Sequence, residues 1–80
     1  MTLEIGQVVL AKAGRDKGRL LAVTAIGADR VLVCDGKERP LERPKAKNPR
    51  HLQATAMHLD PQSMATNRKL KQALRALQTK

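Results

Sequence analysis

The chain has 80 residues, and its 16 Lys and Arg against seven Asp and Glu give a formal net charge of +9. A chain this short forms one domain with a small core, which argues against a deep catalytic cleft. The positive surplus attracts polyanions, so the composition favours a nucleic acid as the partner. Most of the surplus lies late in the sequence: residues 1–36 carry +1 (five bases, four acids) and residues 37–80 carry +8 (eleven bases, three acids).

The absence of Phe, Tyr and Trp restricts the kind of nucleic acid that the chain can bind. Proteins that bind single strands stack bases on aromatic side chains, at about 1–3 kcal/mol per base. This chain has no such side chain. The expected ligand is therefore structured RNA, recognised through its backbone, groove shape and 2′-hydroxyl groups.

The single cysteine, Cys34, lies in an apolar run and cannot form an intramolecular disulfide, which favours a core position and a reducing compartment. The first residues show no secretory signal pattern, and no stretch approaches the roughly 20 apolar residues of a membrane span. We therefore expect a soluble, cytoplasmic protein that has no membrane partner.

The first half of the chain alternates short β-branched runs with glycine-containing turns, a pattern that predicts strands at 7–11, 19–26 and 30–34. The turns fall at 14–18 and 27–29. The dipeptide Asp35-Gly36 favours a two-residue hairpin, with a return strand at 37–41. A last strand is expected at 51–59.

A basic segment and a helix follow. Residues 40–50 contain three prolines among several Lys and Arg, which predicts an extended, solvated arm. After Asp60-Pro61, a helix is expected to begin at a cap formed by Ser63, Thr66 or Asn67 and to run to about Gln78. The helix is amphipathic. Its apolar face consists of Leu70, Ala73, Leu74 and Leu77, and the opposite face of Arg68, Lys71, Gln72 and Arg75.

Residues 5–23, IGQVVLAKAGRDKGRLLAV, resemble a KOW motif, with an apolar strand, a loop, and a glycine before the next strand. Residues 3–59 as a whole resemble small bacterial KOW-domain RNA-binding proteins that are related to archaeal and eukaryotic large-subunit ribosomal proteins. Further matches are VLVCDG at 31–36, LERPK at 41–45 and HLQ at 51–53. The resemblance implies an SH3-like five-stranded barrel, which we place in residues 1–59, and the helix predicted from the residue pattern forms a second segment in 60–80. It also implies binding to ribosomal RNA of the large subunit, with contacts to ribosomal proteins.

Three groups of residues are candidate phosphate contacts. The glycine-bounded loop allows backbone and cations to approach a phosphate closely. The arm and the basic helix face would add further contacts along the phosphate backbone. The predicted RNA-binding residues are Lys12, Arg15, Lys17, Gly18 and Arg19 in the loop, Arg43, Lys45, Lys47 and Arg50 in the arm, and Arg68, Lys71 and Arg75 in the helix.

The sequence offers no residue for a catalytic role, and a cofactor, a metal and a small-molecule substrate are not expected. His51 and His58 are seven residues apart, which places them on opposite faces of a strand, and no full set of zinc ligands accompanies them. Glu38 and Glu42 lie among Arg39 and Arg43, so ion pairs explain them better than acid/base chemistry. The protein is therefore expected not to be an enzyme.

Two other functions remain open. KOW domains also mediate protein contacts in transcription elongation factors, so the chain could be a protein-interaction adaptor that uses the domain and the apolar face of the helix. This alternative requires Leu70, Leu74 and Leu77 to be available to a partner. Binding to double-stranded DNA is a weaker third hypothesis.

Overall fold

The computed structural model describes residues 3–78 and confirms a mainly β chain with a C-terminal helix. Its elements are β1 (Gln7–Ala11), β2 (Leu20–Ile26), β3 (Val31–Cys34), β4 (Lys45–Lys47), a 3-10 turn η1 (Pro49–His51), β5 (Leu52–His58) and α1 (Asn67–Gln78). Residues 1–2 and 79–80, the outer ends of the predicted segments 1–59 and 60–80, lie outside this range. No helix within residues 3–78 is long and apolar enough to cross a membrane.

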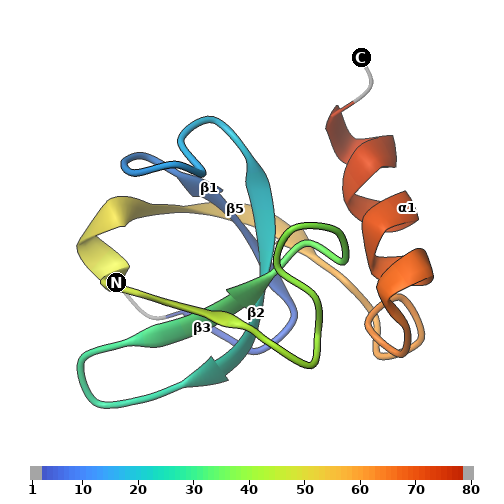
Figure 1. Cartoon of the computed structure of the whole chain (residues 1–80), viewed down its shortest axis with the longest axis horizontal. Helices are drawn as coiled ribbons and strands as arrows, with labels where there is room; N and C mark the ends of the chain where they lie inside the picture. Colours follow the sequence, from blue (N-terminus) through green and yellow to red (C-terminus); the bar gives the residue numbers. More distant parts are fainter. Residues whose placement is uncertain (1–2, 79–80) are drawn as a thin grey trace.

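The five strands form one antiparallel sheet in the order β4-β3-β2-β1-β5. The sheet curls, and η1 carries the chain from one edge strand, β4, to the other, β5 (Figure 1). Among the described residues no backbone ladder joins β4 to β5, so the sheet is open at these edges. The predicted closed barrel is therefore not confirmed.

Alternating side chains along the central strands supply two apolar clusters, one on each face of the sheet. Val9, Leu21 and Val33 belong to the cluster inside the curl. Val8 and Ala22 point the other way and pack with α1. This alternation is the two-residue period of a β-strand, and here it makes the central strands apolar on both faces.

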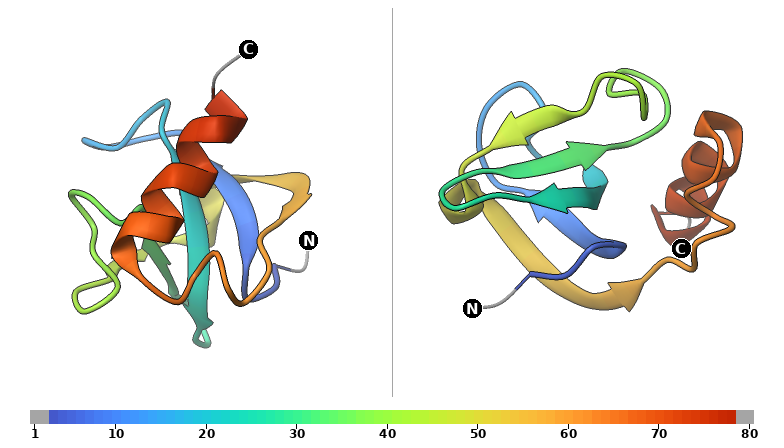
Figure 2. Two further views of the ribbon diagram at one scale, coloured as in Figure 1. Left: turned by 90° about the vertical axis from the view of Figure 1, so that its right-hand side faces the viewer. Right: turned by 90° about the horizontal axis from the view of Figure 1, so that it is seen from below.

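The helix α1 docks on the outer face of the curled sheet (Figures 1 and 2). Its first turn is capped by the Thr66 hydroxyl, which accepts a hydrogen bond from the Lys69 backbone N–H at 3.1 Å. Leu70 and Leu74 are buried in the outer cluster, and Leu77 packs against it. The apolar helix face is therefore occupied by the chain's own sheet.

The segment that follows β3 differs from the prediction. Residues 37–41 form a loop rather than a return strand, and β4, further along the chain, pairs with β3 instead. One reason is Asp35, whose carboxylate accepts backbone hydrogen bonds from Lys37 at 2.8 Å and Arg39 at 2.9 Å and so holds a wider turn than a two-residue hairpin. Pro40 also lacks the N–H that a strand would use.

The predicted solvated arm is wrong for its second half. Residues 45–47 are the edge strand β4, and residues 49–51 form η1. Asn48 begins this turn, since its side chain accepts a hydrogen bond from the Arg50 N–H at 2.9 Å. Proline at the first position of the turn is compatible with η1 because its missing N–H is not needed there.

The loop after β3 lies directly against the start of α1. Gly36 has a φ of +81°, and a Cβ added there would lie 2.3 Å from the Asn67 carbonyl oxygen and 2.9 Å from the Lys71 nitrogen. Asn67 secures the same contact from the other side, because its side-chain oxygen accepts a hydrogen bond from the Leu41 N–H at 2.7 Å. Only glycine fits this approach without displacing the helix.

We expect Gly36→Ala to destabilise the protein more than Gly18→Ala. Both glycines have φ near +85° (81° and 87°), so alanine brings the same left-handed strain of about 1–2 kcal/mol at either position. Nothing lies within 4 Å of the Cβ position at Gly18, whereas Gly36 faces the helix backbone. The clash should cost a further 1–3 kcal/mol or so. Urea denaturation of both variants measures the difference, and equal losses would mean that the loop does not hold the helix this closely.

Candidate nucleic-acid interface

A buried carboxylate, Asp16, organises the loop between β1 and β2. Its Oδ2 lies 3.2 Å from Lys47 Nζ and 3.2 Å from Arg39 Nη2, and its side chain is 3% exposed. These two ion pairs join the loop to β4 and to the loop after β3. Lys47 Nζ also lies 3.5 Å from the Ala13 carbonyl oxygen, so this ammonium faces inward.

The environment of Asp16 lowers its pKa. Burial by itself would raise the pKa of this carboxyl group, but the hydrogen bonds and the positive charges of Lys47 and Arg39 outweigh burial. Asp16 is thus held as a carboxylate, and its charge is directed inward. Lys47 is therefore a buried structural residue, and the prediction that it lies in a solvated arm is wrong.

The loop turns so that its basic residues point outward. Gly14 and Gly18 both have positive φ, and the Gly18 N–H donates to the Ala11 carbonyl oxygen at 2.9 Å, which closes the loop. Within the loop Arg15 and Lys17 are exposed on either side of buried Asp16. Burial of Asp16 therefore leaves the two neighbouring cations of the loop exposed to solvent.

Arg50, from the predicted arm, lies beside the start of this loop. Lys12 and Arg50 line one hollow together with Leu3, Pro49 and Leu52. The Lys12 N–H donates to the His51 carbonyl oxygen at 2.8 Å, which fixes η1 next to the loop. Two cations from separate parts of the chain thereby come together.

Arg19, at the other end of the loop, borders two further hollows. The first is lined by Arg15, Asp16, Arg19, Glu38 and Arg39. The second is lined by Arg19, Leu20, Asp35, Lys37, Lys71, Leu74, Arg75 and Gln78, and is named the α1 groove below. Arg19 forms an ion pair with Glu38 and lies 4.0 Å from Asp35. The structure thus brings the loop next to two of the three predicted helix cations.

Some predicted residues lie outside these three hollows. Four exposed residues line none of them: Lys17, Arg43, Lys45 and Arg68. Neither do Gly18 and the buried Lys47. Conversely, Lys37 and Arg39 do line them and were missed, because residues 37–41 were expected to form a strand. Pro40 was the signal that could have placed both residues in a loop, because proline lacks the N–H that a strand uses.

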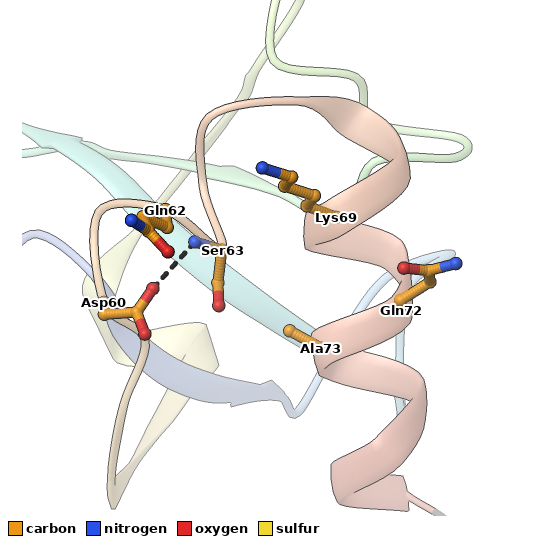
Figure 3. Close-up of a pocket in the computed structure, with 6 residues that line it drawn as sticks. All are labelled: Asp60, Gln62, Ser63, Lys69, Gln72 and Ala73. Carbon is orange, nitrogen blue, oxygen red and sulfur yellow. Dashed lines mark hydrogen bonds between the residues drawn. The ribbon is translucent and has the colours of Figure 1, made fainter.

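A fourth hollow lies between α1 and the turn that precedes it (Figure 3). It is lined by Asp60, Gln62, Ser63, Lys69, Gln72 and Ala73. Asp60 accepts a hydrogen bond from the Ser63 N–H at 2.8 Å, which makes a turn before the helix. One carboxylate and one ammonium leave this hollow with no net charge, so it does not match a polyanion.

Most of the remaining cysteine, histidine and glutamate side chains are buried or contact other groups of the chain. Cys34 is fully buried, as expected, and burial raises the pKa of its thiol, which disfavours a reactive thiolate. His58 Nε2 lies 2.9 Å from Glu4 Oε1, whereas His51 belongs to η1. Glu38 and Glu42 contact Arg19 and Asn67 rather than the adjacent arginines. Within residues 3–78 no three His, Cys, Asp or Glu side chains group together as metal ligands.

We expect Asp16→Asn to remove a pH-dependent part of the stability. A carboxylate with a lowered pKa contributes its full stabilisation above the ordinary value of 3.8 and loses it as the pH falls through the folded-state pKa. The variant should be about 3 kcal/mol less stable near neutral pH, because Lys47 and Arg39 lose their anion. The difference in the free energy of unfolding between wild type and Asp16→Asn should shrink as the pH falls toward 3.

Urea denaturation at several pH values tests this expectation. The matched control is Asp29→Asn, which neutralises an exposed carboxylate in the turn between β2 and β3. The control should differ little from wild type at any pH. A gap for Asp16→Asn that stays constant with pH would show that the lost stability does not come from the ion pairs.

Comparisons of the chain with protein-family models and with curated proteins give no match. The resemblance to KOW proteins therefore rests on the sequence motifs quoted above. The case for a function rests on charge and on the geometry of the loop, the turn and the helix.

Proposed function

We propose that the chain binds structured RNA through phosphate contacts around the loop between β1 and β2. The observation that carries the proposal is that three hollows border this one loop and collect cations from it, from η1, from the loop after β3 and from α1. A surface of this kind follows a phosphate backbone without requiring aromatic stacking. The absence of Phe, Tyr and Trp favours a helical or folded RNA.

We further propose that the curled sheet is an SH3-like domain of the KOW type and that the RNA is ribosomal. The order of short strands and the loop with Gly14 and Gly18 support this, together with the sequence motifs. The two edge strands, β4 and β5, are not hydrogen-bonded to each other, and the turn η1 connects them along the chain. The ribosomal assignment depends on the resemblance alone.

The packing of α1 disfavours the adaptor alternative, which relied in part on the apolar face of the helix. Leu70 and Leu74 are 0% and 4% exposed, and they pack on the chain's own sheet. What the outer side of α1 presents is polar and basic, with Arg68, Lys71 and Arg75 exposed. This surface suits a polyanion better than an apolar protein partner.

Affinity for a duplex-containing RNA should fall steeply with salt. If about five phosphates are engaged, the slope of log K against log salt should be about −3.5 to −4.5. The variant Arg15→Ala/Lys17→Ala should weaken binding and reduce the steepness by about 1.4–1.8, the share of two phosphates. Fluorescence anisotropy at several salt concentrations measures both quantities.

The control for this measurement is Arg30→Ala/Lys69→Ala, which removes the same charge elsewhere. Arg30 is exposed and directly precedes β3, and the turn between β2 and β3 lies at the opposite end of the sheet from the β1–β2 loop (Figure 1). Lys69 lines the hollow that has no net charge (Figure 3). Equal losses in both double variants would indicate attraction by net charge only, with no defined surface. A DNA duplex of the same sequence, bound as tightly as the RNA, would favour the DNA hypothesis instead.

The ribosomal part of the proposal calls for a separate test. Tagged protein in an extract of its own cells should sediment with the large ribosomal subunit on a sucrose gradient and should remain there at high salt. Absence from ribosomal fractions at low salt would exclude the ribosome as the target. It would leave open another structured RNA.

A further inference from the structure

We infer that the α1 groove binds one phosphodiester of the RNA backbone together with its ribose, so that α1 is part of the binding site. The inference rests on the proposed function and names the site at which the helix takes part. The groove is lined by four cations, Arg19, Lys37, Lys71 and Arg75, and by one carboxylate, Asp35. Its lining therefore has a net charge of +3 (four minus one), or +2 when Glu38, the partner of Arg19, is included.

The four cations come from three segments that are far apart in the sequence. Arg19 ends the loop between β1 and β2, Lys37 belongs to the loop after β3, and Lys71 and Arg75 lie one turn apart on α1. Arg19 is paired with Glu38 and lies 4.0 Å from Asp35, whereas Lys37 and Lys71 are exposed like charges on separate segments and repel each other. A bound anion at this position would offset the repulsion.

The groove is held rigidly on both sides. The Gly36 backbone lies against the Asn67 and Lys71 backbone, and the Asn67 side chain bonds to Leu41. On the helix side, Leu70 and Leu74 are anchored in the outer apolar cluster. Cations on fixed backbone segments lose less conformational freedom when a ligand binds.

The lining of the groove suits a nucleotide unit better than a free anion. Leu20, which is only partly buried, contributes apolar surface beside the cations that matches the carbon atoms of a ribose, and the groove has a volume of about 420 Å³. The Gln78 side chain adds an amide that can bond to a 2′-hydroxyl. An anionic lipid headgroup is a poorer match because the leucines of α1 are already covered by the sheet.

Asp35 does not prevent this use. One of its carboxylate oxygens accepts hydrogen bonds from the Lys37 and Arg39 backbone, and its side chain is 13% exposed. Its role is to set the position of Lys37. We therefore place the phosphate toward Lys37 and Lys71, away from Asp35. Glu38 is different: its side chain is 54% exposed, and it competes with the RNA for Arg19.

Two variants test the groove in opposite directions. Lys37→Ala/Lys71→Ala should weaken binding of a hairpin RNA about tenfold and should reduce the salt slope by about 1.4–1.8, since two cations leave the interface. Glu38→Gln should tighten binding about two- to fivefold, because Arg19 loses a competing carboxylate. Both changes are at exposed side chains, and circular dichroism with urea denaturation verifies that each variant is folded.

The outcomes separate this inference from the proposed function. If wild type binds the hairpin RNA and Arg15→Ala/Lys17→Ala weakens it, but Lys37→Ala/Lys71→Ala behaves like the control Arg30→Ala/Lys69→Ala, the groove inference is wrong and the proposed function stands. If wild type does not bind structured RNA, both fail. If the groove variant lowers binding to anionic phosphatidylglycerol vesicles but not to RNA, the ligand is a lipid surface and the inference is overturned.

Discussion

The arrangement of this small domain depends on the ion pairs of Asp16 with Lys47 and Arg39. One buried carboxylate joins three segments that the sheet alone does not connect: the loop between β1 and β2, the loop after β3, and the edge strand β4. Buried ion pairs often add little net stability, but breaking one is costly because a charge remains without its partner. Here the pairs hold both loops against β4. The exposed cations of both loops depend on that placement.

A second constraint is the close approach of Gly36 to α1. The apolar contacts of Leu70 and Leu74 hold the helix on the sheet, but such contacts allow small shifts. A backbone that lies against the Asn67 carbonyl, together with the side-chain bond from Asn67 to Leu41, leaves much less room to move. The helix and the loop after β3 therefore behave as one unit, and the α1 groove between them keeps its shape.

The sequence predicted those parts of the fold whose determinants are local. The alternation of apolar residues located β1 correctly and β2 and β3 to within one residue, and the spacing of leucines gave α1 and its buried face. Where the determinants are distant, prediction failed. The pairing of β3 with β4, rather than with residues 37–41, depends on Asp35 and on the contact of Gly36 with the helix. Local patterns contain no information on such contacts.

The candidate site shows the same division. Outward positions for Arg15 and Lys17 followed from the turn, because glycines bracket the loop. By contrast, Lys47 resembled any other lysine of a basic segment, and its burial follows only from a partner 31 positions earlier, Asp16. The neighbourhood of Arg19, Lys37 and Lys71 likewise exists only after the helix has docked. Composition predicted that the surface is positively charged. Tertiary contacts decided which cations lie next to one another on it.

The acids of this basic chain differ in their surroundings. Asp16 is buried between two cations, Asp35 and Asp60 accept backbone hydrogen bonds in turns, and Glu42 bonds to Asn67. These carboxylates support local structure and are directed at groups within the chain. Most of the cations, in contrast, extend from loops and from the outer side of α1. Other acids, such as Asp29 and Glu38, are exposed, so the basic character of the surface comes from the excess of 16 Lys and Arg over seven Asp and Glu. Around the β1–β2 loop, burial of the Asp16 carboxylate leaves Arg15 and Lys17 exposed, and their positive field is the one that would attract a phosphate backbone.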